Sequence, residues 1–149
     1  MVHLHLVIIV LIKIFLIIYL SVFCNSRKSA ASSASVLSKH IKFSLEADKL
    51  QLLNIMARGL SDSKLRDLVV DHHIGFHHAG LTTEDKKIIE QLFSSGLLLV
   101  LTCTSTLALG VNLPAQLVVI KSTQQNIAGS WREYTETQVG PFIKGLRIL

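Results

Sequence analysis

The sequence predicts an α/β domain with a parallel sheet and flanking helices, and three observations support this fold class. Short apolar runs at 97–103 and 117–120 are typical of buried strands. Segments with helical signals alternate with the strand candidates, which indicates a parallel sheet. The length of 149 residues suits one domain and leaves little room for two.

The first strand candidate lies within an apolar run at 4–23 that has two incompatible interpretations. The whole run is long enough to cross a membrane, and its central Lys13 would cost roughly 3 kcal/mol, which the apolar neighbours offset. Arg27 and Lys28 would then favour a cytoplasmic C-terminal side. Alternatively, residues 17–24 form a buried parallel strand, because such strands are continuous apolar runs. Composition alone does not separate the two.

The remaining elements follow in order and have recognisable ends. Gly59 stops the second helix, and the Ser-Asp-Ser run at 61–63 caps the third. Thr82 or Thr83 begins the fourth helix, and Gly96 ends it. The expected helices span 28–40, 46–58, 64–70 and 82–93, and the expected later strands span 74–77, 97–103 and 117–120.

Composition excludes several classes of protein. Half of the residues are hydrophobic and the mean hydropathy is +0.49, so the chain has enough apolar surface to fold. Its two cysteines, Cys24 and Cys103, cannot form a disulfide framework or a zinc cluster, which favours a reducing compartment. The net charge of +5 is compatible with a polyanionic partner without requiring one.

The strongest chemical signal follows the strand candidate at 97–103. Thr104, Ser105 and Thr106 offer three hydroxyls, together with unpaired backbone N–H groups if a helical turn begins there. Such a surface suits a phosphate, although hydroxyl residues also simply cap helices. Arg27 and Lys28 follow the first strand candidate and are able to reach a nucleic-acid phosphate, or else are solvated turn residues.

Two other chemistries are disfavoured. Four histidines lie at 72, 73, 77 and 78, but Gly75 and Gly80 argue against the helix that would align them on a metal. We expect a strand-to-turn segment with partly buried imidazoles instead. No Gly-x-x-x-x-Gly-Lys-Ser/Thr motif occurs, so we expect no ATP hydrolysis by this chain alone.

Several motifs together resemble a known family. They are Phe-Cys-Asn-Ser-Arg-Lys at 23–28, His-His-Ala-Gly-Leu at 77–81, Thr-Ser-Thr-Leu-Ala-Leu-Gly-Val-Asn-Leu-Pro-Ala at 104–115 and Val-Ile-Lys-Ser-Thr at 119–123. Over about 22–137 the chain resembles the second RecA-like lobe of Ski-two-like superfamily-two helicases. Within that family, the segments at 121–123 and 133–137 look most like the meiotic crossover DNA helicases.

The resemblance implies roles for particular residues. Ser26 and Arg27 match the fourth motif, at the nucleic-acid backbone. Thr104, Ser105 and Thr106 match the phosphate contacts of the fifth motif, and Gly110 and Asn112 match its link to the nucleotide cleft. His78 and Gly80 match the segment between. The complete family protein uses ATP and magnesium, binds single-stranded DNA through its phosphates, pairs this lobe with a first RecA-like lobe and works in the nucleus.

The match stops at both ends. The family continues into a Gln-x-x-Gly-Arg-x-Gly-Arg motif, whose place is taken here by an unrelated segment at 138–147, and Arg147 does not replace the arginines. We therefore expect three parts: an apolar segment at 1–16, an incomplete helicase C-terminal lobe at 17–137 and a divergent tail at 138–149. Our hypothesis is a partial or misassembled product of a helicase gene, with both ends translated from non-coding sequence. The alternative is a non-catalytic nucleic-acid-binding protein or a remnant anchored in a membrane through 4–23.

Overall fold

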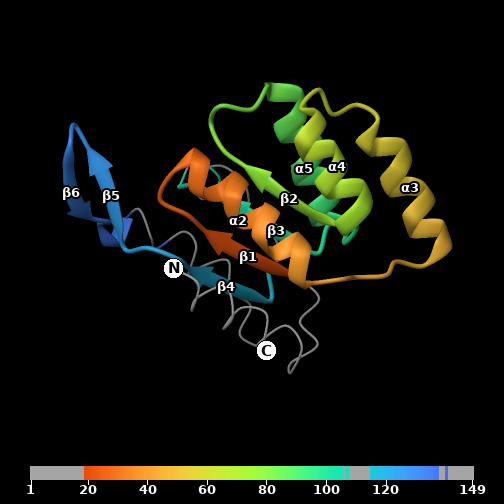
Figure 1. The fold of residues 1–149 in the computed structure, drawn as a ribbon, viewed down its shortest axis with the longest axis horizontal. Coiled ribbons are helices and arrows are strands. Elements are labelled where there is room, and N and C mark those ends of the chain that lie inside the picture. Colours follow the sequence, from red (N-terminus) through yellow and green to blue (C-terminus); the bar gives the residue numbers. More distant parts are fainter. Residues whose placement is uncertain (1–18, 106, 108–114, 138–139, 141–149) are drawn as a thin grey trace.

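The structure is a computed structural model that describes residues 19–105, 107, 115–137 and 140. It confirms an α/β fold with a parallel sheet and flanking helices (Figure 1). The helices are α2 (Arg27–His40), α3 (Ala47–Ala57), α4 (Ser63–His72) and α5 (Thr83–Ser94). The strands are β1 (Leu20–Phe23), β2 (Ile74–His77), β3 (Val100–Cys103), β4 (Leu117–Ile120), β5 (Gln124–Ile127) and β6 (Ser130–Glu133).

Four strands form the main sheet in the order β2-β3-β1-β4, with every neighbouring pair parallel. Phe23 at the end of β1 is in register with Cys103 of β3 and with Ile120 of β4. His77 at the end of β2 is likewise in register with Cys103. The carboxyl ends of all four strands therefore meet at one edge of the sheet, which is where open α/β sheets carry their ligand sites.

Helices cover both faces of the sheet. The Thr102 hydroxyl of β3 donates a hydrogen bond of 2.7 Å to the Ala30 carbonyl, which fixes α2 on that face. On the opposite face, Gly75 of β2 approaches Leu98 and Ile89, the latter from α5, so closely that a Cβ at Gly75 would lie 2.9 Å from Leu98 Cδ2. Small residues thus allow the helices to approach, as the Ala- and Ser-rich sequence of α2 predicts.

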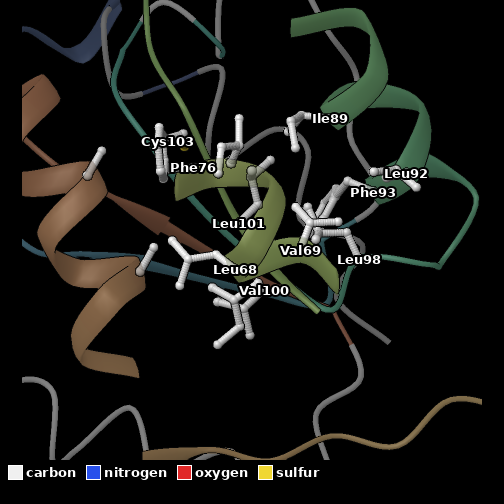
Figure 2. Close-up of a cluster of buried hydrophobic side chains, with 14 of the residues drawn as sticks. Leu68, Val69, Phe76, Ile89, Leu92, Phe93, Leu98, Val100, Leu101 and Cys103 are labelled. Carbon is white, nitrogen blue, oxygen red and sulfur yellow. The ribbon is translucent and has the colours of Figure 1, made fainter. Parts of the chain in front are cut away.

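A large part of the core lies between the sheet and its helices on the β2 side (Figure 2). Leucine, valine and phenylalanine side chains from α4, β2, α5 and β3 pack together there, and Val69, Ile89, Leu92, Phe93 and Leu98 are fully buried. Burying one such side chain contributes about 1.5–3 kcal/mol. Helix α3 packs outside this core on α4 and α5 and leaves Leu50, Leu52 and Ile55 exposed.

Side-chain caps set the beginnings of three helices. The side chains of Ser26, Asp62 and Thr82 each accept a hydrogen bond from a backbone N–H in the first turn of α2, α4 and α5. The expected caps at 61–63 and at Thr82 are therefore confirmed. Asp85, three residues after Thr82, is buried and also binds Ser61 through both carboxylate oxygens, which ties α5 to the turn before α4.

The helix bounds shift by one or two residues from the expected ones, and three further differences follow. β1 begins at Leu20, and residues 17 and 18 of the expected strand lie outside the described residues. β3 begins at Val100 rather than at 97, because the amides of Leu97 and Leu98 donate to the Leu92 carbonyl in a turn after α5. The third difference is the antiparallel hairpin β5–β6, which the sequence analysis missed.

A two-residue turn connects β5 to β6. Ala128 and Gly129 have φ values of 51° and 85°, the geometry of tight hairpin turns, and the Asn126 side chain accepts a hydrogen bond from the Gly129 amide. The hairpin extends beyond the carboxyl edge of the main sheet (Figure 1). After it, the Tyr134 ring packs edge-on against Phe23, with ring centres 5.1 Å apart.

The structure decides between the two interpretations of the N-terminal run only where it describes that run. Leu20, Val22 and Phe23 are buried strand residues within the sheet, which confirms the strand interpretation for them and is not compatible with a membrane span that ends at 23. Residues 4–18 lie outside the described part. Among the described helices, none has both the length and the apolar character needed to cross a bilayer.

Candidate nucleic-acid interface

Four loops follow the four parallel strands at the carboxyl edge, and backbone hydrogen bonds connect them. The Cys24 amide donates to the Cys103 carbonyl at 2.7 Å, and the Thr104 amide donates to the His77 carbonyl at 3.2 Å. The Lys121 amide donates to the Phe23 carbonyl at 2.9 Å. The strand ladder therefore continues one residue past the strand ends, and the loops that carry the candidate site residues have a fixed common base.

Ser26 and Arg27 lie at the start of α2, directly after β1, and both are exposed. The Ser26 hydroxyl oxygen accepts a hydrogen bond of 3.0 Å from the Ser29 amide and so caps the helix. A hydroxyl that accepts in this way still has its own proton to donate. The first turn of α2 contains no acidic residue, so the positive end of the helix dipole and the Arg27 cation act together. This arrangement favours a bound anion.

The loop after β2 leaves room for Arg27. A Cβ on Gly80 would lie 3.2 Å from Nη1 of Arg27, so the absence of a side chain lets the guanidinium lie against this loop. The Gly80 amide donates to His78 Nδ1 at 3.1 Å, and the imidazole stacks on Phe76 with ring centres 5.4 Å apart. Burial, followed by the charge of Arg27, lowers the pKa of His78, which favours a neutral ring that accepts this bond.

Thr104 and Ser105 follow β3 and are half-buried. The Thr104 carbonyl accepts a hydrogen bond from the Leu107 amide, which makes a turn. One expectation is wrong here: the Thr104 amide is paired with the His77 carbonyl, because it continues the β2–β3 ladder, and so it is not available to a ligand. Contacts by this segment must therefore use other groups.

Three further candidate residues, Thr106, Gly110 and Asn112, lie outside the described residues. Their assignment to phosphate and nucleotide contacts stays a prediction. The structure does bring the loop at Ser26 and Arg27 beside the loop at Thr104 and Ser105, because β1 and β3 are neighbours in register. These loops are the part of the candidate interface that the structure positions.

The loop after β4 adds residues that the sequence analysis did not assign to a site. The Lys121 ammonium donates hydrogen bonds of 2.8 Å to Ser33 Oγ and 3.3 Å to Ser29 Oγ on α2. The Asn25 side-chain amide donates to Ser122 Oγ at 3.4 Å. A signal for this contact exists in the sequence, since Ser29 and Ser33 are one helical turn apart and lie on one face, but nothing in the sequence pairs that face with Lys121.

Two histidines near β2, His77 and His78, have side-chain partners, whereas Nδ1 of His73 and Nδ1 of His77 are buried without a hydrogen-bond partner among the described residues. His77 is buried, and its Nε2 lies 2.9 Å from Glu90 Oε1 of α5, while His73 ends α4 with a positive φ of 58°. The segment is a strand followed by a turn with buried or half-buried imidazoles at 73, 77 and 78, as expected. Within the described ranges, no group of three or more His, Cys, Asp or Glu residues is placed to hold a metal ion.

The two cysteines at the strand ends are protected from reaction. Burial raises the pKa of the Cys103 thiol to about 12 and also raises the pKa of the Cys24 thiol. Both side chains are buried and free. A thiolate is the nucleophilic form of cysteine, so neither group is suited to covalent chemistry at this edge.

Comparison with known proteins gives a consistent result. Residues 19–135 match the family model described as the helicase conserved C-terminal domain. Probable ATP-dependent DNA helicase HFM1 of Xenopus tropicalis and its Homo sapiens counterpart are each 48% identical over 118 residues, which is 79% of this chain but only 9% and 8% of those proteins. ATP-dependent DNA helicase MER3 of Saccharomyces cerevisiae is 36% identical over 118 residues, covering 79% of this chain and 9% of the yeast protein. The chain thus spans less than a tenth of the length of these relatives.

Proposed function

Because the chain belongs to the helicase conserved C-terminal domain family, we propose that residues 17–137 are the second motor lobe of an ATP-dependent DNA helicase and bind the backbone of single-stranded DNA. The single observation that carries the proposal is the meeting of two loops at the carboxyl edge, one with Ser26 and Arg27, the other with Thr104 and Ser105. A cation, a helix N-terminus and hydroxyls together suit phosphate oxygens.

The names of the similar proteins support the class of partner. Three relatives at 36–48% identity are named as ATP-dependent DNA helicases, so we propose DNA as the nucleic acid. The resemblance to the meiotic crossover DNA helicases leads us to propose the nucleus as the site of action. The most divergent of the three, MER3 of Saccharomyces cerevisiae, aligns over the same share of this chain.

Gly110 and Asn112, the two nucleotide-cleft candidates, lie outside the described part, and the described residues do not include an acidic cluster that fits magnesium. In the proposed complete helicase, ATP and magnesium would be held largely by the first RecA-like lobe, which pairs with this one. We expect the chain by itself to bind DNA without hydrolysing ATP.

The test measures the affinity of the 149-residue chain for a fluorescently labelled single-stranded oligonucleotide. Fluorescence anisotropy gives this affinity at a series of salt concentrations. Arg27→Ala should weaken binding about tenfold and reduce the salt slope by about one, because one phosphate contact is lost. Arg58→Ala is the matched control, since Arg58 is an exposed arginine at the far end of α3. Equal losses for both variants, or no binding by the parent chain at low salt, would overturn the proposal.

A further inference from the structure

Lys121 makes an unusual set of contacts for a lysine. Its side chain is half-buried and binds two neutral hydroxyls, Ser29 Oγ and Ser33 Oγ. Among the residues that the structure describes, no carboxylate forms an ion pair with this ammonium. Partly buried lysines normally keep an acidic partner or reach water, so the contact with α2 needs another explanation.

Charge does not explain the contact. Ser29 belongs to the first turn of α2, where the helix dipole is positive and a cation is electrostatically unfavourable, and Ser33 belongs to the second turn. What the contact supplies is geometry. Lys121 is fixed at its own backbone, because its amide donates to Phe23 of β1. The side chain therefore connects the base of the carboxyl edge to the beginning of the helix that carries Arg27.

Neighbouring contacts extend the same connection. The Ser29 amide is the group that Ser26 caps, and Ser33, which is fully buried, also accepts a hydrogen bond from the Cys24 thiol. Ser122, the next residue after Lys121, accepts a hydrogen bond from Asn25. The loop after β4 thus holds both the turn before α2 and the inner side of its first two turns.

We propose that Lys121 is a positioning residue that fixes the start of α2, and with it Ser26 and Arg27, for contact with the nucleic-acid backbone. The effect of Lys121 on DNA binding rests on the proposed function. Lys121 would act on the interface indirectly, by holding Ser26 and Arg27 in position. Lys121 itself is held by the two serines and need not touch a phosphate.

A double-mutant cycle tests the inference on the 149-residue chain with the labelled oligonucleotide described above. Lys121→Met should weaken binding about fivefold and reduce the salt slope by about one, because Arg27 loses its position. In the Arg27→Ala background the same change should leave the salt slope unchanged and weaken binding by less than fivefold, through Ser26 alone. A further fall in the salt slope in that background would mean that Lys121 contacts phosphate directly, and would overturn the inference.

Ser33→Ala distinguishes the positioning role of Lys121 from its charge. It removes the hydroxyl that accepts the 2.8 Å hydrogen bond from Lys121 and leaves every positive charge in place. It should also weaken binding and lower the salt slope, whereas Ser32→Ala, an exposed serine on the same helix that bonds only to its own helix backbone, should do neither. Equal behaviour of the two serine variants would contradict the inference. Circular dichroism confirms that each variant is folded, and Ser33→Ala remains informative if Lys121→Met does not fold.

Amide hydrogen exchange gives a readout that does not depend on DNA. Lys121→Met and Ser33→Ala should speed exchange at the start of α2, including the Ser29 amide, with no change in α5. If the parent chain binds no DNA but this local effect is present, the positioning role stands and the proposed function fails. Unchanged exchange at the start of α2 would overturn the positioning role whatever the binding result.

Discussion

The two edge strands of the main sheet differ in how deeply their side chains are buried. β2 lies at one edge and all four of its residues are buried, because α2, α4 and α5 pack against it. β4 lies at the other edge and all four of its residues are only half-buried. Within the described part of the chain, β4 pairs with β1 and with no other strand. The sequences Ile-Gly-Phe-His and Leu-Val-Val-Ile suggest the reverse, since the second is the more apolar.

The difference shows that helix packing, more than strand hydrophobicity, protects an edge. β2 contains a glycine and a histidine, yet the glycine admits Leu98 and Ile89, and the histidine bonds to Glu90 of α5. The apolar side chains of β4 have fewer described neighbours. An edge with accessible backbone groups and apolar side chains invites pairing with another strand.

The largest expected effect comes from truncating matched isoleucines at the two edges. Ile74 of β2 is fully buried, so Ile74→Ala should lower the free energy of unfolding by about 3 kcal/mol through lost contacts and a residual cavity. Ile120 of β4 is half-buried, so Ile120→Ala should cost about 1 kcal/mol. Urea unfolding followed by circular dichroism measures both. Similar losses would remove the contrast between the edges.

The pH dependence of stability should come from the β2 side. Burial lowers the pKa of His77 below its ordinary value of 6.5; the hydrogen bond and charge of Glu90 act to raise this pKa, and the charge of Lys86 lowers it further. Burial also lowers the pKa of His73 below 6.5. The unfolded chain then binds more protons than the folded chain, so the free energy of unfolding is constant above that value and falls as the pH drops below it.

Urea unfolding at about pH 7.5 and about pH 5.5 measures this change, in a range where histidine alone among ordinary side chains titrates. His77→Gln keeps a donor for Glu90 but removes the titrating group, so its stability should vary less over the same range. A variant that keeps the full dependence would show that His77 does not contribute to it.

The smallest expected change in stability comes from proline on the outer side of β4. The Leu117 amide donates to the Tyr19 carbonyl, just before β1, and the Lys121 amide donates to the Phe23 carbonyl at its end. By alternation, the Val118 amide therefore faces away from the sheet and the Val119 amide faces β1. Val118→Pro should reduce self-association in light scattering while changing the free energy of unfolding by less than about 1 kcal/mol. Val119→Pro, the matched control, should be clearly more destabilising. Unchanged scattering for Val118→Pro would show that this edge is not the contact between copies.

Most of the fold could be predicted from local signals. The strands at Ile74–His77 and Leu117–Ile120 have the expected bounds, and the caps at Asp62 and Thr82 have the expected role. The β5–β6 hairpin was missed because its turn places Ala128, rather than asparagine or aspartate, at a positive φ. Its strands are also short and polar, so they lack the alternation that marks a strand.

The candidate site could be predicted only in part. The roles of all four described candidates stay predictions: Ser26 comes only from the family resemblance, whereas Arg27, Thr104 and Ser105 were expected because polar residues directly follow apolar strands. Two contacts were not expected, because both depend on the strand order β2-β3-β1-β4. They are the pairing of the Thr104 amide with His77 and the contact of Lys121 with Ser29. The spacing of residues along the sequence does not determine which strands are neighbours in the sheet.

The glycine beside Arg27 has a consequence for how this surface changes over evolution or under engineering. Since a single methyl group at Gly80 would lie 3.2 Å from the guanidinium, the direction of the Arg27 side chain depends on a residue 53 positions away that carries no charge. A substitution there would redirect a cation without altering the isoelectric point. Affinity for a polyanion would thus be adjustable by steric means at an uncharged position.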